Sequence, residues 1–277
     1  MKLLVIGKNG QVGSALQSCA AEQQGLSITA LGRSELDLTN PDAIEDAFSQ
    51  NAYDAVINAA AYTAVDRAEE ERDAAYAVNR DAPAVLASLC AAKDIPFLHI
   101  STDFVFNGQK ELAYLETDAC HPLGVYGQSK WEGELKVAKA CEKYLILRTA
   151  WVFGGEQNFV NTMKRLAETR DELSVVDDQR GCPTAAQDIA RCLLEMVKTA
   201  VKADFQEWGI YHYAGMPSVS WYEFATEILN SDPTTTVNPI LTSGYPTPAA
   251  RPANSVLDCD KIKSVFGIAQ PDWRKRL

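Results

Sequence analysis

The sequence of 277 residues has only three histidines, His99, His121 and His212, and they stand far apart. It has seven cysteines but no Cys-x-x-Cys pair. Structural zinc sites need cysteine and histidine ligands at short spacings, so we expect no metal site of this kind. An odd number of irregularly spaced cysteines argues against a disulfide framework. It predicts reduced thiols in a cytoplasmic protein.

Long apolar runs and an excess of positive charge are also missing. No run approaches the ~18 residues of a membrane span, and a strand begins so early that we expect no signal peptide. The 37 acidic residues outnumber the 26 basic ones, which gives a net charge of −11. Such a chain lacks the electrostatic footprint of a nucleic-acid-binding protein, so we expect neither nucleic-acid nor membrane partners. Phosphate-bearing small molecules stay compatible with this charge, because a few local arginines and backbone N–H groups suffice to bind them.

The first half of the chain alternates apolar strands with helical segments. The strands are apolar throughout rather than at every second residue, which is typical of a parallel sheet covered on both faces. We therefore predict an α/β, doubly wound parallel sheet of the Rossmann type. Strands are predicted at 3–6, 26–31, 55–58, 96–101 and 144–148, and helices at 12–22, 41–50, 69–93 (with a break at Pro83) and 123–141.

The alternation weakens after residue 154. We expect a dinucleotide-binding domain over 1–154 with returning elements at about 184–214, and a smaller C-terminal substrate-binding region over 155–183 and 215–277. The segment 231–255 is rich in proline, threonine and serine and is predicted to be a loop. The other predicted elements are helices at 159–169, 184–201 and 221–230 and a strand at 210–214.

Three glycines, Gly7, Gly10 and Gly13, follow the first strand and lead into the first helix. Glycine allows a tight turn and a close approach of the backbone to a pyrophosphate, and the N–H groups at the start of the helix then face the phosphates. The place of this glycine loop in a β-α-β unit favours dinucleotide binding. The alternative is a glycine-rich turn without a ligand.

The end of the second strand bears on the choice between NAD and NADP. In NAD-binding proteins an acidic residue about 20 positions beyond the glycine loop binds the ribose 2′-hydroxyl. Here Arg33 stands at that distance from Gly13, and the nearest acid is Glu35. A guanidinium favours a 2′-phosphate, so we expect NADPH to be preferred, with NADH as the other candidate. The alternative is that Arg33 is an ordinary exposed arginine.

Of the ten tyrosines, only Tyr126 is followed four residues later by a lysine, Lys130. On a helix the two side chains share one face. Such a pair suits proton transfer to a carbinol oxygen if the pKa of the phenol is lowered from its usual value of about 10. Thr102 follows an apolar strand, where ligands of open parallel sheets bind, and its hydroxyl can donate to a carbonyl. The alternative role for Thr102 is to cap a helix.

These motifs, in this order, resemble the extended short-chain dehydrogenases/reductases. Four more segments narrow the resemblance to dTDP-4-dehydrorhamnose reductases over essentially the whole chain. They are 58–66 (NAAAYTAVD), 148–154 (RTAWVFG), 178–184 (DQRGCPT) and Ala250-Arg251-Pro252 with Ser255.

The resemblance implies reduction of the C4 keto group of dTDP-4-dehydro-L-rhamnose by NAD(P)H to give dTDP-L-rhamnose, a precursor of cell-surface polysaccharide. Thr102 would polarise the carbonyl, Tyr126 would be the general acid, and Lys130 would lower the pKa of Tyr126 and hold the nicotinamide ribose. The residues expected beside the cofactor are Gly7, Gly10, Gln11, Val12 and Gly13 at the pyrophosphate, Arg33, Asp37 and Leu38 at the adenosine, and Ala61, Tyr62 and Thr63 at a strand end. The residues expected at the sugar nucleotide are Thr102, Asp103, Trp151 and Arg251.

Two of the implied residues have an alternative role. Trp151 would touch the sugar or would pack in the core at a strand end. Asn79 would act as a proton relay or would only satisfy backbone groups.

Some members of the family are described as magnesium-dependent dimers with glutamate ligands near the first helix. This first helix reads Ser14-Ala15-Leu16-Gln17 and has no acid before Glu22. We therefore doubt a magnesium site and leave open whether the protein is a monomer or a homodimer. Two other functions stay open: another nucleotide-sugar 4-reductase or epimerase, and a non-catalytic NADP-binding partner of methionine adenosyltransferase.

Overall fold

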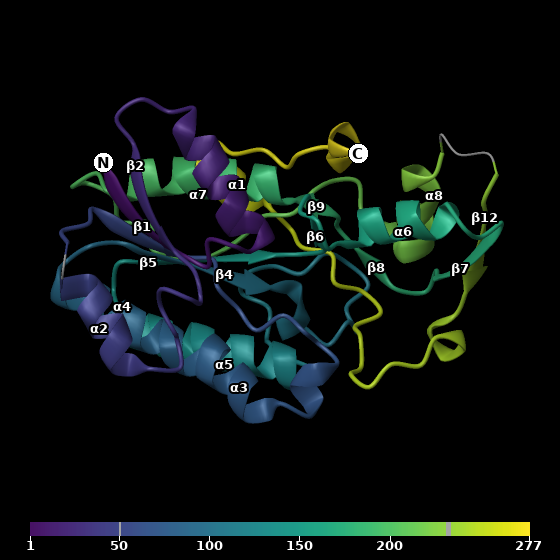
Figure 1. Cartoon of the computed structure of the whole chain (residues 1–277), viewed down its shortest axis with the longest axis horizontal. Coiled ribbons are helices and arrows are strands. Elements are labelled where there is room, and N and C mark those ends of the chain that lie inside the picture. The colour runs from purple at the N-terminus through teal and green to yellow at the C-terminus, as the bar shows by residue number, and fades with distance from the viewer. Residues whose placement is uncertain (50, 231–233) are drawn as a thin grey trace.

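The computed structural model describes residues 1–49, 51–230 and 234–277. Its centre is a six-stranded parallel sheet in the order β10-β5-β4-β3-β1-β2 (Figure 1). The predicted doubly wound α/β fold is confirmed. The strands are β1 (Lys2–Ile6), β2 (Ser27–Leu31), β3 (Ala55–Asn58), β4 (Phe97–Thr102), β5 (Tyr144–Thr149) and β10 (Gly209–His212).

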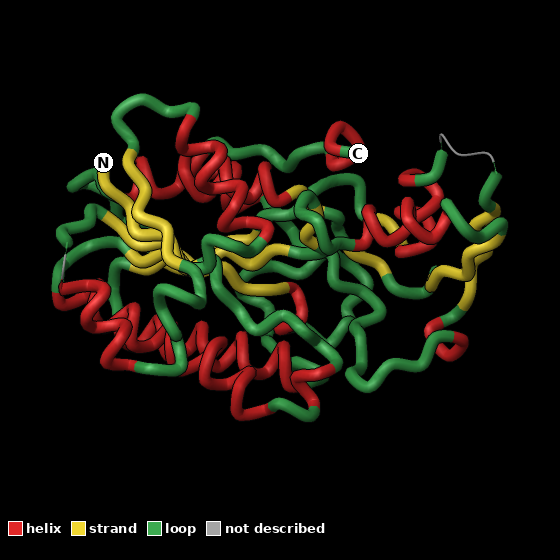
Figure 2. Tube along the Cα trace, in the orientation of Figure 1, coloured by secondary structure: helices red, strands yellow, loops and turns green. Residues whose placement is uncertain are grey.

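Helices cover both faces of this sheet (Figure 2). Along β1, Leu3 and Val5 point into the core on one face, and Leu4 and Ile6 point into the core on the other. Because both faces are buried, the strand is apolar throughout. On the first face lie α1 (Gln11–Ala21), α7 (Ala186–Ala200) and α9 (Asp260–Phe266), and on the second α2 (Pro41–Ser49), α4 (Ala82–Ala92) and α5 (Val125–Ala140).

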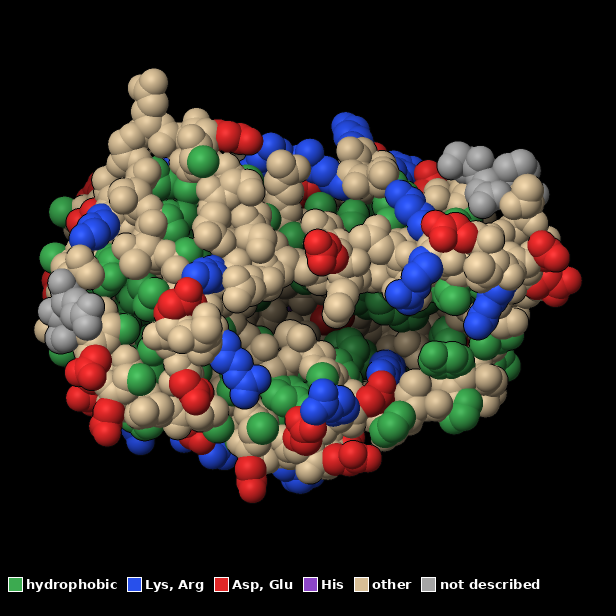
Figure 3. All heavy atoms as spheres, viewed as in Figure 1, with side chains coloured by type: hydrophobic (Ala, Val, Ile, Leu, Met, Phe, Trp, Pro, Cys, Tyr) green, Lys and Arg blue, Asp and Glu red, His purple; other side chains and the backbone are tan. Residues whose placement is uncertain are grey.

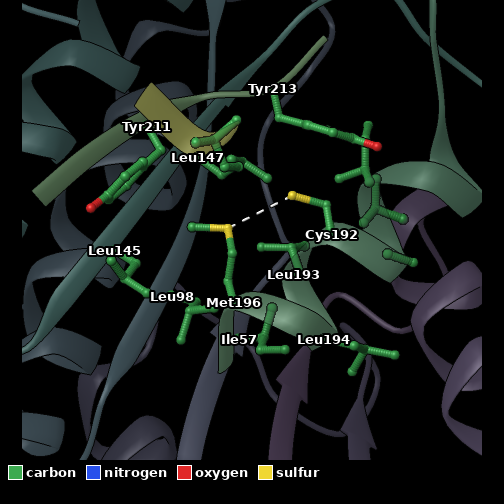
Figure 4. Packing of buried hydrophobic residues seen from close by; sticks show 14 of the residues in the cluster. Ile57, Leu98, Leu145, Leu147, Cys192, Leu193, Leu194, Met196, Tyr211 and Tyr213 are labelled. Carbon is green, nitrogen blue, oxygen red and sulfur yellow. Dashed lines mark hydrogen bonds between the residues drawn. The ribbon is translucent and has the colours of Figure 1, made fainter. Parts of the chain in front are cut away.

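The core beneath α7 is closely packed. Figure 4 shows Leu193 and Met196 of this helix lying against Leu98 of β4 and Leu145 of β5, all of them buried. The Met196 sulfur also lies 3.8 Å from the Cys192 thiol. All seven cysteines are free, as expected for reduced thiols, and six of them are buried.

A smaller region follows at the right of Figure 1. Its core is formed by residues such as Met163, Leu173, Phe224 and Trp273. Ser220 and Glu223 form a capping box that begins α8. The elements are α6 (Phe159–Ala167), α8 (Trp221–Ile228) and three strand pairs: β7 (Glu172–Val176) with β12 (Thr236–Ile240), β8 (Arg180–Gly181) with β11 (Val219–Ser220), and β6 (Val152–Phe153) with β9 (Thr184–Ala185).

Several segments of this half differ from their prediction, and β7 was not predicted. The predicted loop 231–255 contains β12, and its residues 231–233 lie outside the described part. β12 escapes a sequence-based prediction because it includes Pro239, which a strand tolerates when it has a neighbour on one side only. The predicted helix 184–201 starts two residues late, because Thr184 and Ala185 first pair with β6.

The predicted helix 69–93 is interrupted just before Pro83. A 3₁₀ turn (Arg67–Glu69), α3 (Arg72–Tyr76) and a π-helical turn (Ala77–Asp81) precede α4. Pro83 lies in the first turn of α4, where its missing N–H costs nothing. The predicted helix 41–50 is α2, with Asn40 as its cap; residue 50 itself lies outside the described part. Among the described helices, none combines the length and apolarity needed to cross a bilayer.

Candidate active site

A cleft of about 2280 Å³ runs past the carboxyl ends of the central strands into the smaller region, and part of it is seen as a hollow in Figure 3. The chain leaves β1 to β2 on one side and returns to β3 on the other, and ligands of open α/β sheets bind at such a switch point. The cleft brings together every site residue expected from the sequence except Gly13 and Asn79.

The glycine loop is shaped by its contacts with the backbone. Gly7 has φ +93°, and a Cβ there would lie 2.6 Å from the Ala60 nitrogen. A Cβ on Gly13 would lie 2.1 Å from the Gly7 carbonyl oxygen, so Gly13 lets the loop and helix pack together. Gly10 is the N-cap of α1, and no side chain of the described residues caps this helix. Its N-terminal N–H groups and positive dipole end therefore fit a pyrophosphate.

The side chain of Gln11 is engaged in hydrogen bonds within the protein. Its Oε1 accepts from the Gly155 N–H at 3.1 Å, and its Nε2 donates to the Val152 carbonyl at 3.5 Å. Only the backbone of Gln11 is then placed to contact a pyrophosphate. The side chain ties the glycine loop to the segment that enters the smaller region.

The acid nearest to Arg33 is already engaged. Glu35 pairs with Lys8 and accepts from the Gly32 N–H at 2.9 Å. Lys8 above all lowers the pKa of the Glu35 carboxyl to about 2. Arg33 is exposed and lines the cleft. The end of β2 therefore presents the Arg33 guanidinium to the cleft. In NAD-binding proteins a carboxylate at this place favours a ribose without a phosphate.

Asp37 and Leu38 line the same end of the cleft. The carboxylate of Asp37 accepts from the backbone and the hydroxyl of Thr39 at 2.9 and 2.8 Å, which lowers its pKa. Leu38 is buried, next to the buried Leu36. Leu36 and Leu38 form an apolar wall, and the hydrogen bonds between Asp37 and Thr39 fix the turn behind it. Such a wall suits a flat base.

Thr102 and Tyr126 meet at the end of β4. The Thr102 hydroxyl accepts from the Phe104 N–H at 3.2 Å and donates to Asp103 Oδ1 at 3.0 Å. It also forms a hydrogen bond with the Tyr126 phenol. The Phe104 ring lies edge-on to Tyr126, with the ring centres 5.7 Å apart. These contacts hold the Tyr126 phenol beside the Thr102 hydroxyl, which the sequence predicts as a donor to a carbonyl.

Burial raises the pKa of Tyr126 to about 12, although its contact with Thr102 opposes this. The sequence had suggested that Lys130 would lower this pKa. In the protein alone Lys130 does not do so, because its amine bonds to the Ile100 carbonyl at 2.7 Å and contacts His99. Tyr126 is therefore protonated at neutral pH, the state that a proton donor requires.

Asp103 is a carboxyl held almost entirely out of water, with 2% of its surface exposed. Burial raises its pKa to about 6, while hydrogen bonds from Ser255 and Thr102 lower it. Ser255 comes from the C-terminal region, so this carboxyl joins both parts of the chain at the site. At neutral pH the carboxylate accepts a hydrogen bond from the Thr102 hydroxyl and orients it.

The strand-end loop of Ala61, Tyr62 and Thr63 is fixed from behind by Asn79. Asn79 accepts from the Tyr62 N–H at 2.8 Å and donates to the Tyr62 carbonyl at 3.0 Å and the Ser129 hydroxyl at 3.0 Å. The side chain is fully buried. Of its two roles left open by the sequence, these contacts fit the satisfaction of backbone groups.

Trp151 lines the cleft from the loop after β5, with φ +44°. Its indole stacks on Trp221, with the ring centres 3.5 Å apart and the planes 5° apart, and Gly181 leaves room for its other side. Trp221 was not singled out from the sequence, since only the fold brings α8 to this loop. Trp151 therefore combines packing with exposure to the cleft.

Arg251 lines the cleft but is paired. Its Nη1 and Nη2 donate to the two oxygens of Asp66 at 2.6 and 2.8 Å, and Nη1 also donates to the Ala249 carbonyl. This bidentate pair joins the loop after β3 to the C-terminal region. Asp66 belongs to the motif at 58–66, but the spacing of residues in the sequence did not predict its pairing with Arg251.

Comparison with known proteins agrees with this geometry. The family model described as RmlD substrate binding domain matches residues 1–277. The chain is 45% identical over 287 residues to the dTDP-4-dehydrorhamnose reductase of Aggregatibacter actinomycetemcomitans, covering 100% of this chain and 97% of that protein.

Two solved structures are similar along the whole chain. One is a dTDP-4-dehydrorhamnose reductase from Clostridium acetobutylicum (TM-score 0.94, 36% identity, covering 99% of this chain and 96% of that one). The other is the Bacillus anthracis enzyme in complex with NADP (TM-score 0.91, 33% identity, covering 99% and 96%). The chain therefore belongs to the dTDP-4-dehydrorhamnose reductases, a family of extended short-chain dehydrogenases/reductases.

Proposed function

We propose that this protein reduces the C4 keto group of dTDP-4-dehydro-L-rhamnose to give dTDP-L-rhamnose, with NADPH as the preferred reductant. The observation that carries the proposal is the meeting of Thr102, Tyr126 and Lys130 in the same cleft as the glycine loop. The full-length relatives of known activity support the substrate. The smaller region, 155–183 with 215–277, would hold the sugar nucleotide.

The dinucleotide, when bound, supplies the hydride. The α1 N-terminus would hold its pyrophosphate, Arg33 a 2′-phosphate, and Leu38 the adenine. Ala61, Tyr62 and Thr63 would line its path toward the carboxyl end of β4. Lys130 is placed to reach the nicotinamide ribose, one helical turn from Tyr126.

Proton transfer falls to the residues at the end of β4. The Tyr126 phenol is protonated and would donate its proton to the C4 oxygen as negative charge develops there. The Thr102 hydroxyl would turn from Asp103 and donate to the C4 oxygen of the substrate. The Phe104 N–H would continue to donate to Thr102 Oγ1 and so hold that oxygen in place. Trp151, supported by Trp221, would form the wall against which the sugar ring lies.

The direct test uses NADPH and dTDP-4-dehydro-L-rhamnose generated in situ, with the product assigned by NMR. We expect NADPH consumption and a rhamnosyl product. NADPH consumption that gives a product with the opposite configuration at C4 would instead indicate another nucleotide-sugar 4-reductase. No turnover, combined with co-purification of a methionine adenosyltransferase, would indicate the regulatory function.

Replacing Arg33 by alanine should change the choice of cofactor. A charge-assisted hydrogen bond to a 2′-phosphate is worth about 1.5–3 kcal/mol, so kcat/KM with NADPH should fall about 10- to 100-fold. The kcat/KM with NADH should change little, because NADH has no 2′-phosphate for Arg33 to bind. Glu35 is engaged with Lys8 and does not contact the ribose either. Arg165→Ala, an exposed arginine outside the cleft, is the control. Equal losses with both cofactors would remove this role for Arg33.

Activity should withstand removal of divalent cations. Within the described ranges no group of three or more His, Cys, Asp or Glu side chains could hold a metal ion. Asp188, the acid in the first turn of α7, already pairs with Arg276, whose Nη2 lies 2.6 Å from its Oδ1. Turnover after dialysis against EDTA should equal that with added magnesium. Loss on chelation and recovery with magnesium would contradict this prediction.

A further inference from the structure

The side chain of Gln11 reaches from the glycine loop to the segment that enters the smaller region. Its Oε1 accepts from the Gly155 N–H at 3.1 Å, and its Nε2 contacts the Val152 carbonyl at 3.5 Å. The two chains pack closely here, because a Cβ on Gly155 would lie 2.8 Å from Gln11 Cγ. Gln11 is also the first residue of α1. The same residue therefore offers its backbone to a pyrophosphate and its side chain to the segment 151–155.

Gly155 is held from both sides. Gln11 accepts its N–H, and its carbonyl accepts from the side-chain amides of Asn158 and Asn161. Asn158 is the N-cap of α6, and its Oδ1 accepts from the Asn161 N–H at 3.1 Å. A row of hydrogen bonds therefore runs from the start of α1 through Gly155 to the start of α6.

The segment 151–155 has little regular structure to fix its position. β6 pairs with β9 over only two residues, and Trp151 and Gly154 have φ angles of +44° and +120°. In Figure 1, β6 lies between the central sheet and α6. The contact with Gln11 therefore fixes the end of a short and irregular connection.

Trp151 begins this segment and forms part of the cleft wall. Its indole stacks on Trp221 with the ring centres 3.5 Å apart, and a Cβ on Gly181 would lie 2.3 Å from the other side of the ring. Trp221 belongs to α8 and Gly181 to β8, so both partners fix the plane of the indole relative to the smaller region. Gln11 instead ties the segment to α1, and so relates this wall to the glycine loop.

We propose that the Gln11 side chain is a positioning residue for the sugar nucleotide: by holding Gly155 it sets the place of the Trp151 wall relative to the glycine loop. The presence of the sugar at Trp151 rests on the proposed function, whereas the position of the indole does not. The backbone of Gln11 keeps its place at the pyrophosphate. Loss of the side chain should therefore weaken binding of the sugar nucleotide and spare that of the dinucleotide.

Gln11→Ala removes both contacts and keeps a good helix former in the first turn of α1. The Kd of the product dTDP-L-rhamnose, measured by calorimetry with NADP⁺ bound, should rise about 3- to 10-fold, as expected for the loss of one hydrogen bond. The Kd of NADPH, measured by its fluorescence, should stay near the wild-type value. An unchanged Kd for the product, or equal losses for both ligands, would overturn the proposal.

Gln17→Ala is the matched control on the same helix. Gln17 lies outside the residues that line the cleft, and its amide donates to the carbonyls of Lys8 and Gly13 at 3.0 and 3.1 Å. Its replacement should leave the Kd of the product unchanged. A loss as large as that of Gln11→Ala would mean that any disturbance of the loop weakens the sugar site, and the proposal would fall.

Gly155→Ala tests the same contact from the other side. The new Cβ would displace the Gln11 side chain and break its hydrogen bonds, so the Kd of the product should rise as in Gln11→Ala. The double variant should bind no more weakly than either single one, because the contact is already lost. Losses that add would show two independent effects and contradict the proposal. If Gln11→Ala does not fold, Gly155→Ala decides by the same measurement.

The position of the indole can be followed without any ligand. In protein labelled with fluorotryptophan, the ¹⁹F signal of Trp151, assigned with Trp151→Phe, should shift in Gln11→Ala and stay in place in Gln17→Ala. An unmoved signal in Gln11→Ala would refute the positioning role even if product binding falls. A shifted signal in a protein whose wild type does not bind dTDP-L-rhamnose would count against the proposed function alone.

Discussion

Tyr126→Phe should reduce turnover by about 10²- to 10⁴-fold, the usual contribution of a general acid. The change removes the phenolic oxygen and keeps the ring that packs edge-on against Phe104. Binding of NADPH, followed by its fluorescence, should therefore stay at the wild-type level. Rapid-mixing measurements of a single turnover would report the chemical step without product release.

Tyr76→Phe is the matched control for this experiment. Tyr76 lies outside the residues that line the cleft, and it packs near Tyr126 in the same small apolar cluster. Its replacement should leave turnover unchanged. A Tyr126→Phe enzyme with nearly full turnover would mean that another group supplies the proton.

Arg148→Met should lower the free energy of unfolding by about 3–5 kcal/mol, the usual cost of leaving a buried charge without its partner. Arg148 on β5 and Glu134 on α5 are each 2% exposed and are joined by two hydrogen bonds of 2.9 and 2.6 Å. The guanidinium also lies over the Phe106 ring, 5.1 Å from its centre. Without it, the Glu134 carboxylate would be stranded in the core.

Urea unfolding of the variant and the wild-type protein at the same pH would measure this loss. The double variant Arg148→Met/Glu134→Leu should recover much of the stability, since no buried charge remains. A double variant as unstable as the single one would show that packing of the arginine, and not the orphaned charge, dominates.

The main sheet could be predicted from the sequence because its strands are buried on both faces. Segments such as 3–6 are apolar throughout and are separated by helices of ordinary length. β7 and β12 were missed for the opposite reason. Each pairs with a single partner far away in the sequence, and β12 contains Pro239.

The candidate site was predicted where its chemistry is local in the chain. The Tyr126–Lys130 spacing and the glycine loop depend on one helix and one turn. The contact between Arg251 and Asp66, and the stack of Trp151 on Trp221, join distant segments and have no signal in spacing.

The place of β10 at the edge of the sheet has a consequence for biosynthesis. Its neighbour β5 is complete long before residue 209 leaves the ribosome, because α6, several short strands and α7 lie between them in the chain. During that interval β5 offers an apolar, unpaired edge, the kind of surface through which nascent chains associate wrongly. Slow elongation across 150–208 would lengthen this exposure, and a chaperone that shields β5 would be needed most at that stage of translation.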